Sequence, residues 1–144
     1  MKQSRRLEPI CHFNRKKEED AAKALAKASQ EMQLQKQRLL DLENYRGEYA
    51  KQFAMAGGAG LNAARMREYQ TFMANLSKAI EQQKSAIHVH EQQFEERKRQ
   101  WLAARSRSKA LETVKDRYLQ QENNQEEKRL QKEIDDRSSR TIKY

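Results

Sequence analysis

The sequence predicts an all-α protein, a long antiparallel two-helix coiled-coil hairpin, and three observations lead to this fold class. Ala, Glu, Leu, Lys and Arg supply 75 of the 144 residues, a composition typical of long helices and coiled coils. Only four glycines and one proline are present, so few turns can be built. Leu, Ile, Val and Phe number only 23, which is also low enough for a disordered chain. Periodicity therefore has to decide between a long helix and no structure.

The first helix is expected over about residues 9–56. It starts near Pro9, because the fixed φ of proline suits the first turn of a helix. Within it, side chains recur in alternating steps of four and three residues, as the a and d positions of a heptad repeat do. This stripe consists of Ala21, Leu25, Ala28, Met32, Gln35, Leu39, Leu42, Arg46, Tyr49, Phe53 and Ala56. Two of its members, Gln35 and Arg46, are polar, so the stripe is imperfect.

A glycine-rich turn over residues 57–60 follows, because glycine tolerates the left-handed backbone that reverses a helix. Asn62 is placed to cap the second helix, which is expected over about residues 62–119. Its stripe consists of Met66, Tyr69, Met73, Leu76, Ile80, Gln83, Ile87, His90, Phe94, Arg97, Trp101, Ala104, Ser108 and Leu111. A repeat held for about six heptads indicates a supercoiled helix pair and argues against disorder.

The hairpin competes with a straight helix that dimerises with another chain. That helix would carry three clustered glycines in its middle, at a cost of about 1 kcal/mol each, so the hairpin is favoured. Residues 1–144 are accordingly predicted to be a single domain. Residues 120–127 (QQENNQEE) contain nothing apolar, and Leu130 and Ile134 then resume helical spacing. We expect residues 120–144 to be a charged frayed helix or tail with no partner arm.

The formal charge of +9 is spread along the chain: +4 on residues 1–56, +5 on 57–118 and zero on 119–144. Dedicated nucleic-acid binders concentrate their charge and interleave aromatic side chains, and this chain does neither. A basic coiled-coil adaptor that binds nucleic acid or an anionic membrane surface nevertheless remains the alternative function. Its footprint would be Arg97, Lys98, Arg99, Arg105, Arg107 and Lys109.

No catalytic residue, metal, cofactor or small-molecule ligand is expected, and the protein is predicted not to be an enzyme. His88 and His90 are two residues apart, so on a helix their imidazoles point in nearly opposite directions and cannot share one ion. A two-helix hairpin also has no interior in which to build a reactive pocket. The lone Cys11 is consistent with a reducing compartment, and no stretch approaches 18 apolar residues. We therefore expect a cytoplasmic protein.

The aromatic side chains indicate a partner site. Most of them lie on the heptad stripes, where packing in the seam explains them, but Tyr45 and Phe72 occupy the flanking g positions. The g flanks of two antiparallel helices face the same side, so these residues extend the seam into a partly exposed apolar edge. This predicted edge consists of Leu42, Tyr45, Tyr49, Phe72, Leu76 and Ala79. Exposed apolar patches usually mark partner sites; the alternative is that the rings lie flat and widen a thin seam.

Residues around this edge resemble the flagellar FliJ family. The resemblance rests on residues 42–49 (LENYRGEY), on the glycine-rich turn, and on residues 69–83 (YQTFMANLSKAIEQQ). Residues 6–9 (RLEP) and the single Trp101 are also similar, so that the resemblance covers most of residues 5–118. Arg38 and Gln83 depart from the pattern, since relatives can carry Gln and His there.

The resemblance implies a component of the flagellar type III export apparatus, with a fold similar to the central stalk subunit of rotary ATPases. It implies three kinds of partner: the hexameric export ATPase, the membrane export gate and export chaperones. Family members engage the gate through the apolar edge, a role that carries over to Leu42, Tyr45, Tyr49, Phe72, Leu76 and Ala79. The expected place is the cytoplasm, in peripheral association with the inner membrane at the flagellar base.

Overall fold

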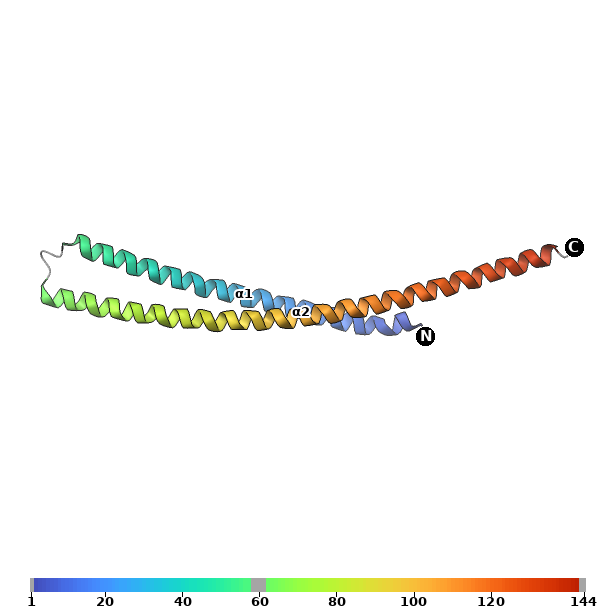
Figure 1. The fold of residues 1–144 in the computed structure, drawn as a ribbon, viewed down its shortest axis with the longest axis horizontal. Helices are drawn as coiled ribbons and strands as arrows, with labels where there is room; N and C mark the ends of the chain where they lie inside the picture. Colours follow the sequence, from blue (N-terminus) through green and yellow to red (C-terminus); the bar gives the residue numbers. More distant parts are fainter. Residues whose placement is uncertain (1, 58–61, 143–144) are drawn as a thin grey trace. The chain divides into compact units, whose positions relative to one another are not determined.

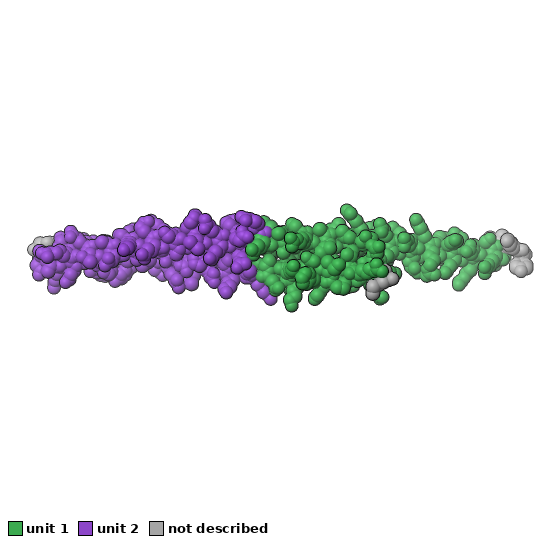
Figure 2. All heavy atoms as spheres, turned by 90° about the horizontal axis from the view of Figure 1, so that it is seen from below, with its two compact units in different colours: residues 1–22, 100–144 green, residues 23–99 purple. Residues whose placement is uncertain are grey.

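The structure, a computed structural model, describes residues 2–57 and 62–142 as two long α-helices (Figure 1). Helix α1 spans Gln3–Met55 and helix α2 spans Ala63–Ile142. The described ranges contain no strand. The two helices pack against each other, which confirms the predicted all-α hairpin. They contribute to two compact units, residues 23–99 and residues 1–22 with 100–144 (Figure 2).

In the unit of residues 23–99 the two helices run antiparallel, and the heptad stripes form the seam between them. The most deeply buried apolar side chains of this unit are Met32, Leu76, Ile80 and Ile87, each at most 9% exposed. Every predicted stripe position from Leu25 to Phe53 is buried or half-buried, as the spacing predicts. On α2 the stripe has two exceptions in this unit, because Met66 and Arg97 are exposed.

A polar layer interrupts this apolar seam. The Gln83 Nε2 group donates hydrogen bonds to the backbone carbonyl oxygen of Gln35 at 2.9 Å and to its Oε1 atom at 2.8 Å. Both side chains are half-buried. Since the bonds join two stripe positions across the helices, they are satisfied only in one alignment of α1 against α2, and they therefore fix the register.

The ends of the helices next to the reversal are capped as their sequence predicts. Gly57 has a φ of +80°, the left-handed conformation in which a residue just past a helix end closes the last turn. At the other end, the Arg65 backbone N–H donates to Asn62 Oδ1 at 2.9 Å, which confirms Asn62 as the cap of α2. The remaining residues of the predicted turn, 58–60, lie outside the described residues.

In the unit of residues 1–22 with 100–144, α1 begins earlier than expected. It starts at Gln3, so that Pro9 lies inside the helix and not in its first turn. Proline has no N–H to donate, so the carbonyl group of Arg5 lacks its usual partner four residues on. The prediction that α1 starts near residue 9 is therefore wrong. Toward the N-terminus the heptad spacing continues past Pro9, through Cys11, Leu7 and Ser4, and all three side chains are buried or half-buried.

Helix α2 also continues past the predicted boundary at residue 119, as a regular helix to Ile142. The expectation that residues 120–144 lack a partner arm is wrong for the first residues of this segment, because Glu122 forms hydrogen bonds to α1. Its Oε2 atom accepts from the Ser4 hydroxyl at 2.6 Å, and its Oε1 atom accepts from the Ser4 backbone N–H at 3.2 Å. This N–H is one of the four at a helix start that have no partner within the helix, so Glu122 caps α1 from the neighbouring helix. Side chains 123–141 are exposed.

The most deeply buried side chains in the seam of this unit are small. They are Cys11 at 1% exposure, Ser108 at 4% and Ser4 at 5%. Beside the seam, Arg15 Nε lies 3.6 Å from Glu112 Oε1. Since Ser4 meets Glu122 while Arg15 meets Glu112, residue numbers rise along one helix as they fall along the other. The helices are antiparallel in this unit too.

Candidate partner-binding site

Five aromatic rings from both helices form one cluster in the unit of residues 23–99. Helix α1 contributes Tyr45, Tyr49 and Phe53, and α2 contributes Tyr69 and Phe72. Phe53 and Tyr69 are stacked with ring centroids 3.7 Å apart, and Tyr49 lies 5.8 Å from Tyr69 and 4.3 Å from Phe72. The rings of Tyr45 and Phe72 meet edge to face, with centroids 5.9 Å apart. Because these contacts join the helices, the cluster fixes their alignment near the reversal.

The heptad positions explain how the cluster reaches the surface. Tyr49, Phe53 and Tyr69 occupy seam positions, whereas Tyr45 and Phe72 flank the seam on the same side. The contact between Tyr45 and Phe72 confirms that the two g flanks face each other. Tyr45 is 51% exposed although it touches Tyr49 and Phe72. About half of the surface of this residue is thus free for a partner.

The six residues of the predicted edge differ in how much surface they present. Leu42, Tyr49, Phe72 and Ala79 are half-buried. Leu76 is only 8% exposed and belongs to the core of the seam. Its expected place on a partly exposed edge is therefore wrong. It lies one helical turn from both Phe72 and Ala79 and offers a partner almost no surface.

A hollow of about 510 Å³ lies beside Tyr45. It is lined by Arg38, Asp41, Leu42, Tyr45 and Gln83. The apolar faces of Leu42 and Tyr45 lie next to one cation and one carboxylate, so the hollow can accept an apolar side chain of a partner and bond a polar group beside it. Arg38 and Asp41 were not predicted as members of the edge. Arg38 stands one heptad before Tyr45, and this spacing is the signal that could have identified it.

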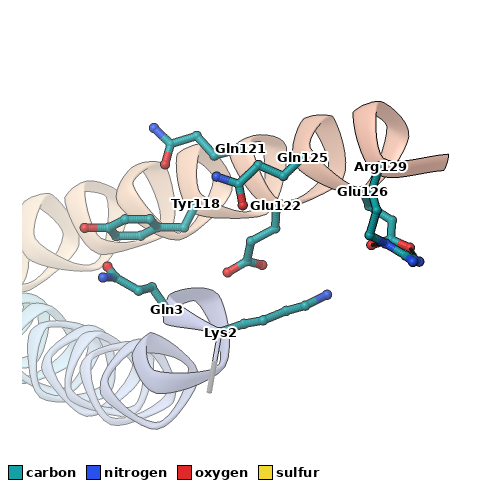
Figure 3. Close-up of a pocket in the computed structure, with 8 residues that line it drawn as sticks. All are labelled: Lys2, Gln3, Tyr118, Gln121, Glu122, Gln125, Glu126 and Arg129. Carbon is teal, nitrogen blue, oxygen red and sulfur yellow. Dashed lines mark hydrogen bonds and ion pairs between the residues drawn. The ribbon is translucent and has the colours of Figure 1, made fainter. Parts of the chain in front are cut away.

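A second, polar hollow of about 490 Å³ lies in the other unit at the start of α1 (Figure 3). It is lined by Lys2, Gln3, Tyr118, Gln121, Glu122, Gln125, Glu126 and Arg129. The carboxylate of Glu122 extends from α2 toward α1 (Figure 3). The hydrogen bond from the Ser4 hydroxyl, together with the Ser4 N–H and the charge of Lys2, holds the pKa of Glu122 below its ordinary value of 4.5. Glu122 thus joins the two helices, whereas Arg129 pairs with Glu126 on its own helix at 2.6 Å.

The basic footprint of the alternative function divides between the two units. Arg97, Lys98 and Arg99 belong to one unit, and Arg105, Arg107 and Lys109 belong to the other. All six side chains are exposed. Arg99 forms an ion pair with Glu96 at 2.8 Å, and the Arg105 guanidinium lies 5.4 Å from the centroid of the Trp101 ring. Within each unit the cations thus share the surface with neutralising or aromatic groups.

The two histidines of α2 differ in exposure. His88 is exposed and lies 3.2 Å from Gln92 Nε2, while His90 is half-buried in the seam. Among residues 2–57 and 62–142 no three His, Cys, Asp or Glu side chains are grouped so that they could hold a metal ion. In the same ranges neither helix contains a segment apolar enough to cross a membrane.

Comparisons with known proteins identify the family. The sequence matches the family described as flagellar FliJ protein over residues 2–143. The flagellar FliJ protein of Salmonella typhi is 28% identical over 134 residues, which cover 90% of this chain and 91% of that protein. The flagellar FliJ protein of Escherichia coli (strain K12) is 28% identical over 102 residues, covering 71% of this chain and 69% of that protein. No solved structure matches the chain. Because the family match spans nearly all of its residues, the chain belongs to the flagellar FliJ family.

Proposed function

We propose that this flagellar export component is a non-enzymatic coupling protein, which binds the hexameric export ATPase and docks on the membrane export gate. In this role it links the ATPase to export and handles export chaperones. It acts in the cytoplasm, in peripheral association with the inner membrane at the flagellar base. Family membership supports the assignment to flagellar export, and the aromatic cluster supports the docking role.

The observation that carries the gate-binding proposal is the half-exposed ring of Tyr45 beside an apolar hollow. Tyr45 is held in place by Tyr49 and Phe72 at centroid distances of 6.4 and 5.9 Å. A ring fixed in this way loses little conformational entropy when a partner covers it, which is why aromatic anchors dominate binding energies. The proposed gate-binding residues are Leu42, Tyr45, Tyr49, Phe72, Leu76 and Ala79. Leu76 acts as the support beneath the others.

The test combines Tyr45→Ala with Phe72→Ala and measures affinity for the purified cytoplasmic part of the export gate by calorimetry. We expect a loss of at least about tenfold, because both anchors of the edge are removed. The matched control combines Leu34→Ala with Leu40→Ala. These side chains are 51% and 50% exposed in the same unit and do not line the hollow, so the control removes exposed apolar surface elsewhere.

The helical content of both double variants is compared by circular dichroism. The control should keep full gate affinity, and both variants should stay as helical as the unaltered chain. Unchanged gate affinity in the Tyr45→Ala, Phe72→Ala variant would contradict the assignment of this edge.

A further inference from the structure

A second group of exposed apolar side chains lies in the unit of residues 1–22 with 100–144, away from the aromatic cluster. Helix α1 exposes 46% of Ile10 and 57% of Phe13, and α2 exposes 37% of Val114. Nothing in the proposed gate contact uses them. An exposed apolar group of this kind on a surface otherwise rich in charge indicates a contact site.

Helical geometry places the three side chains on one side of the seam. Ile10, Phe13 and Lys17 are spaced three and four residues apart, so they share one face of α1. The Lys17 Nζ atom lies 4.6 Å from the centroid of the Phe13 ring, a contact that this spacing allows. The ion pair between Arg15 and Glu112 marks the opposite side of the seam. Because like flanks of antiparallel helices face the same side, Val114 joins Ile10 and Phe13 there.

We call this surface the N-terminal patch: Ile10, Phe13 and Val114 with the cations around them. The cations on the same two helix faces are Arg6, Lys17, Arg107 and Arg117, and all four are exposed. Within residues 2–57 and 62–142 the structure shows no ion pair to any of them. The faces that carry them hold no carboxylate between residues 3 and 17 or between 103 and 121. The patch is therefore apolar at its centre and uniformly positive at its rim.

We propose that the N-terminal patch docks an acidic amphipathic helix of a partner protein. Its apolar stripe would cover Ile10, Phe13 and Val114, and its Asp or Glu side chains would pair with the four cations. A third helix in the groove beside two others is a common mode of recognition. Charge complementarity selects the occupant, because a second copy of this chain would bring four more cations to the same place.

The length of the patch favours a helix over a membrane surface. Its apolar centre covers only about one turn of α1, from Ile10 to Phe13, and one side chain of α2, Val114. Beyond it the same faces carry Gln3 and Gln121 toward one end and Asp20 toward the other. A helix that binds in the plane of a membrane needs an apolar face that continues along its length, whereas a single partner helix needs only a few anchors. The proposal is independent of the gate contact, which involves other residues in the other unit.

The experiment uses the full chain and two synthetic amphipathic peptides that share one leucine stripe. One peptide has Glu beside the stripe and the other has Lys, and each carries a fluorophore for anisotropy. We expect the Glu peptide to bind and the Lys peptide not to bind. Phe13→Ser should weaken binding by about tenfold, and Arg6→Glu combined with Arg117→Glu should weaken it further. Phe13 is more than half exposed, so its replacement leaves the seam intact.

Matched controls distinguish an effect of the N-terminal patch from an effect of net charge or of exposed apolar surface elsewhere in the unit. Arg5→Glu with Lys109→Glu makes the same change in net charge on the faces that carry Arg15 and Glu112. Leu102→Ser removes a side chain that is 46% exposed in the same unit. Both controls should bind the Glu peptide as the unaltered chain does.

Three results would overturn the proposal. The first is an equal loss of binding in the patch variants and in the controls. The second is no binding of the Glu peptide at concentrations up to about 1 mM, the limit of a weak contact. The third is binding to vesicles of phosphatidylcholine with phosphatidylglycerol that depends on Phe13 while the Glu peptide stays unbound, which would assign the patch to a membrane.

Discussion

At the scale of single residues, Gln35 and Gln83 show how this chain balances stability against a unique alignment. Two leucines in their place would extend the apolar seam and remove two polar groups from it. We expect Gln35→Leu with Gln83→Leu to raise the free energy of unfolding by about 1–3 kcal/mol. The variant should also form oligomers more readily, because polar residues in a coiled-coil seam specify the register and the oligomeric state, and this layer has been removed.

Thermal unfolding and light scattering test both parts of this prediction. Gln83→Leu alone should change less, since the half-exposed Gln35 amide can turn to water. A double variant that is less stable and associates no more than the unaltered chain would contradict the prediction.

The Ser4–Glu122 contact makes one helix end sensitive to acid. Because the folded state lowers the pKa of Glu122 below 4.5, the contact stabilises the fold above that pH, and this contribution disappears as the pH falls through the lowered pKa. We expect the amide hydrogens of residues 3–6 to exchange faster in acid, relative to the intrinsic rate, than those near the aromatic cluster. Glu122→Gln should show the faster relative exchange already at pH 7. Identical protection in the variant would contradict this role.

At the scale of the elements, Pro9 is the residue that opposes its helix most strongly. An interior proline costs a helix about 3 kcal/mol, and six residues of α1 precede it. We expect Pro9→Ala to raise the midpoint of thermal unfolding and to slow amide exchange in residues 3–8. The gain in the free energy of unfolding should be at most about 3 kcal/mol, the cost of the interior proline. Glu8→Ala, a change at a neighbouring exposed position, should leave both unchanged. A lower midpoint for Pro9→Ala would show that the proline is needed where it stands.

The sequence predicts the middle of both helices well and their outer ends poorly, for a physical reason. From Leu25 to Phe53 the seam is largely apolar, so periodicity is visible. Toward the start of α1 the same repeat continues through Asn14, Cys11 and Ser4, which are too polar or too small to be recognised as an apolar stripe. Proline preference then suggested a start at Pro9, although tertiary contact with Glu122 extends the helix to Gln3.

The candidate site shows the same division. Heptad position alone predicts that Tyr45 and Phe72 meet, because it fixes the side of the helix to which each side chain points. It also predicts that Leu76, a stripe residue, lies in the seam, where the structure buries it, although the predicted edge counted it as partly exposed. The hollow beside Tyr45 escapes prediction, because Arg38, Asp41 and Gln83 line it only once the helices are packed.

At the scale of the whole molecule, the net charge of +9 is large but thinly spread. Such a chain attracts any polyanion weakly. Its contacts with the phosphates of a nucleic acid weaken as the salt concentration rises. We expect affinity for double-stranded DNA to fall steeply between 50 and 200 mM salt and to be weaker than about 100 µM at physiological salt. Anisotropy with a labelled duplex measures this. Tight binding that persists at high salt would support the alternative of a nucleic-acid adaptor.

The lone thiol of Cys11 has a consequence for how the seam can be observed. The side chain is 1% exposed between the two helices, and the sequence contains no second cysteine. Two folded chains therefore cannot be joined by a disulfide unless this part of the seam first separates. The rate at which a thiol reagent modifies the protein then measures how often α1 and α2 part near Cys11, in the native chain and without an introduced probe.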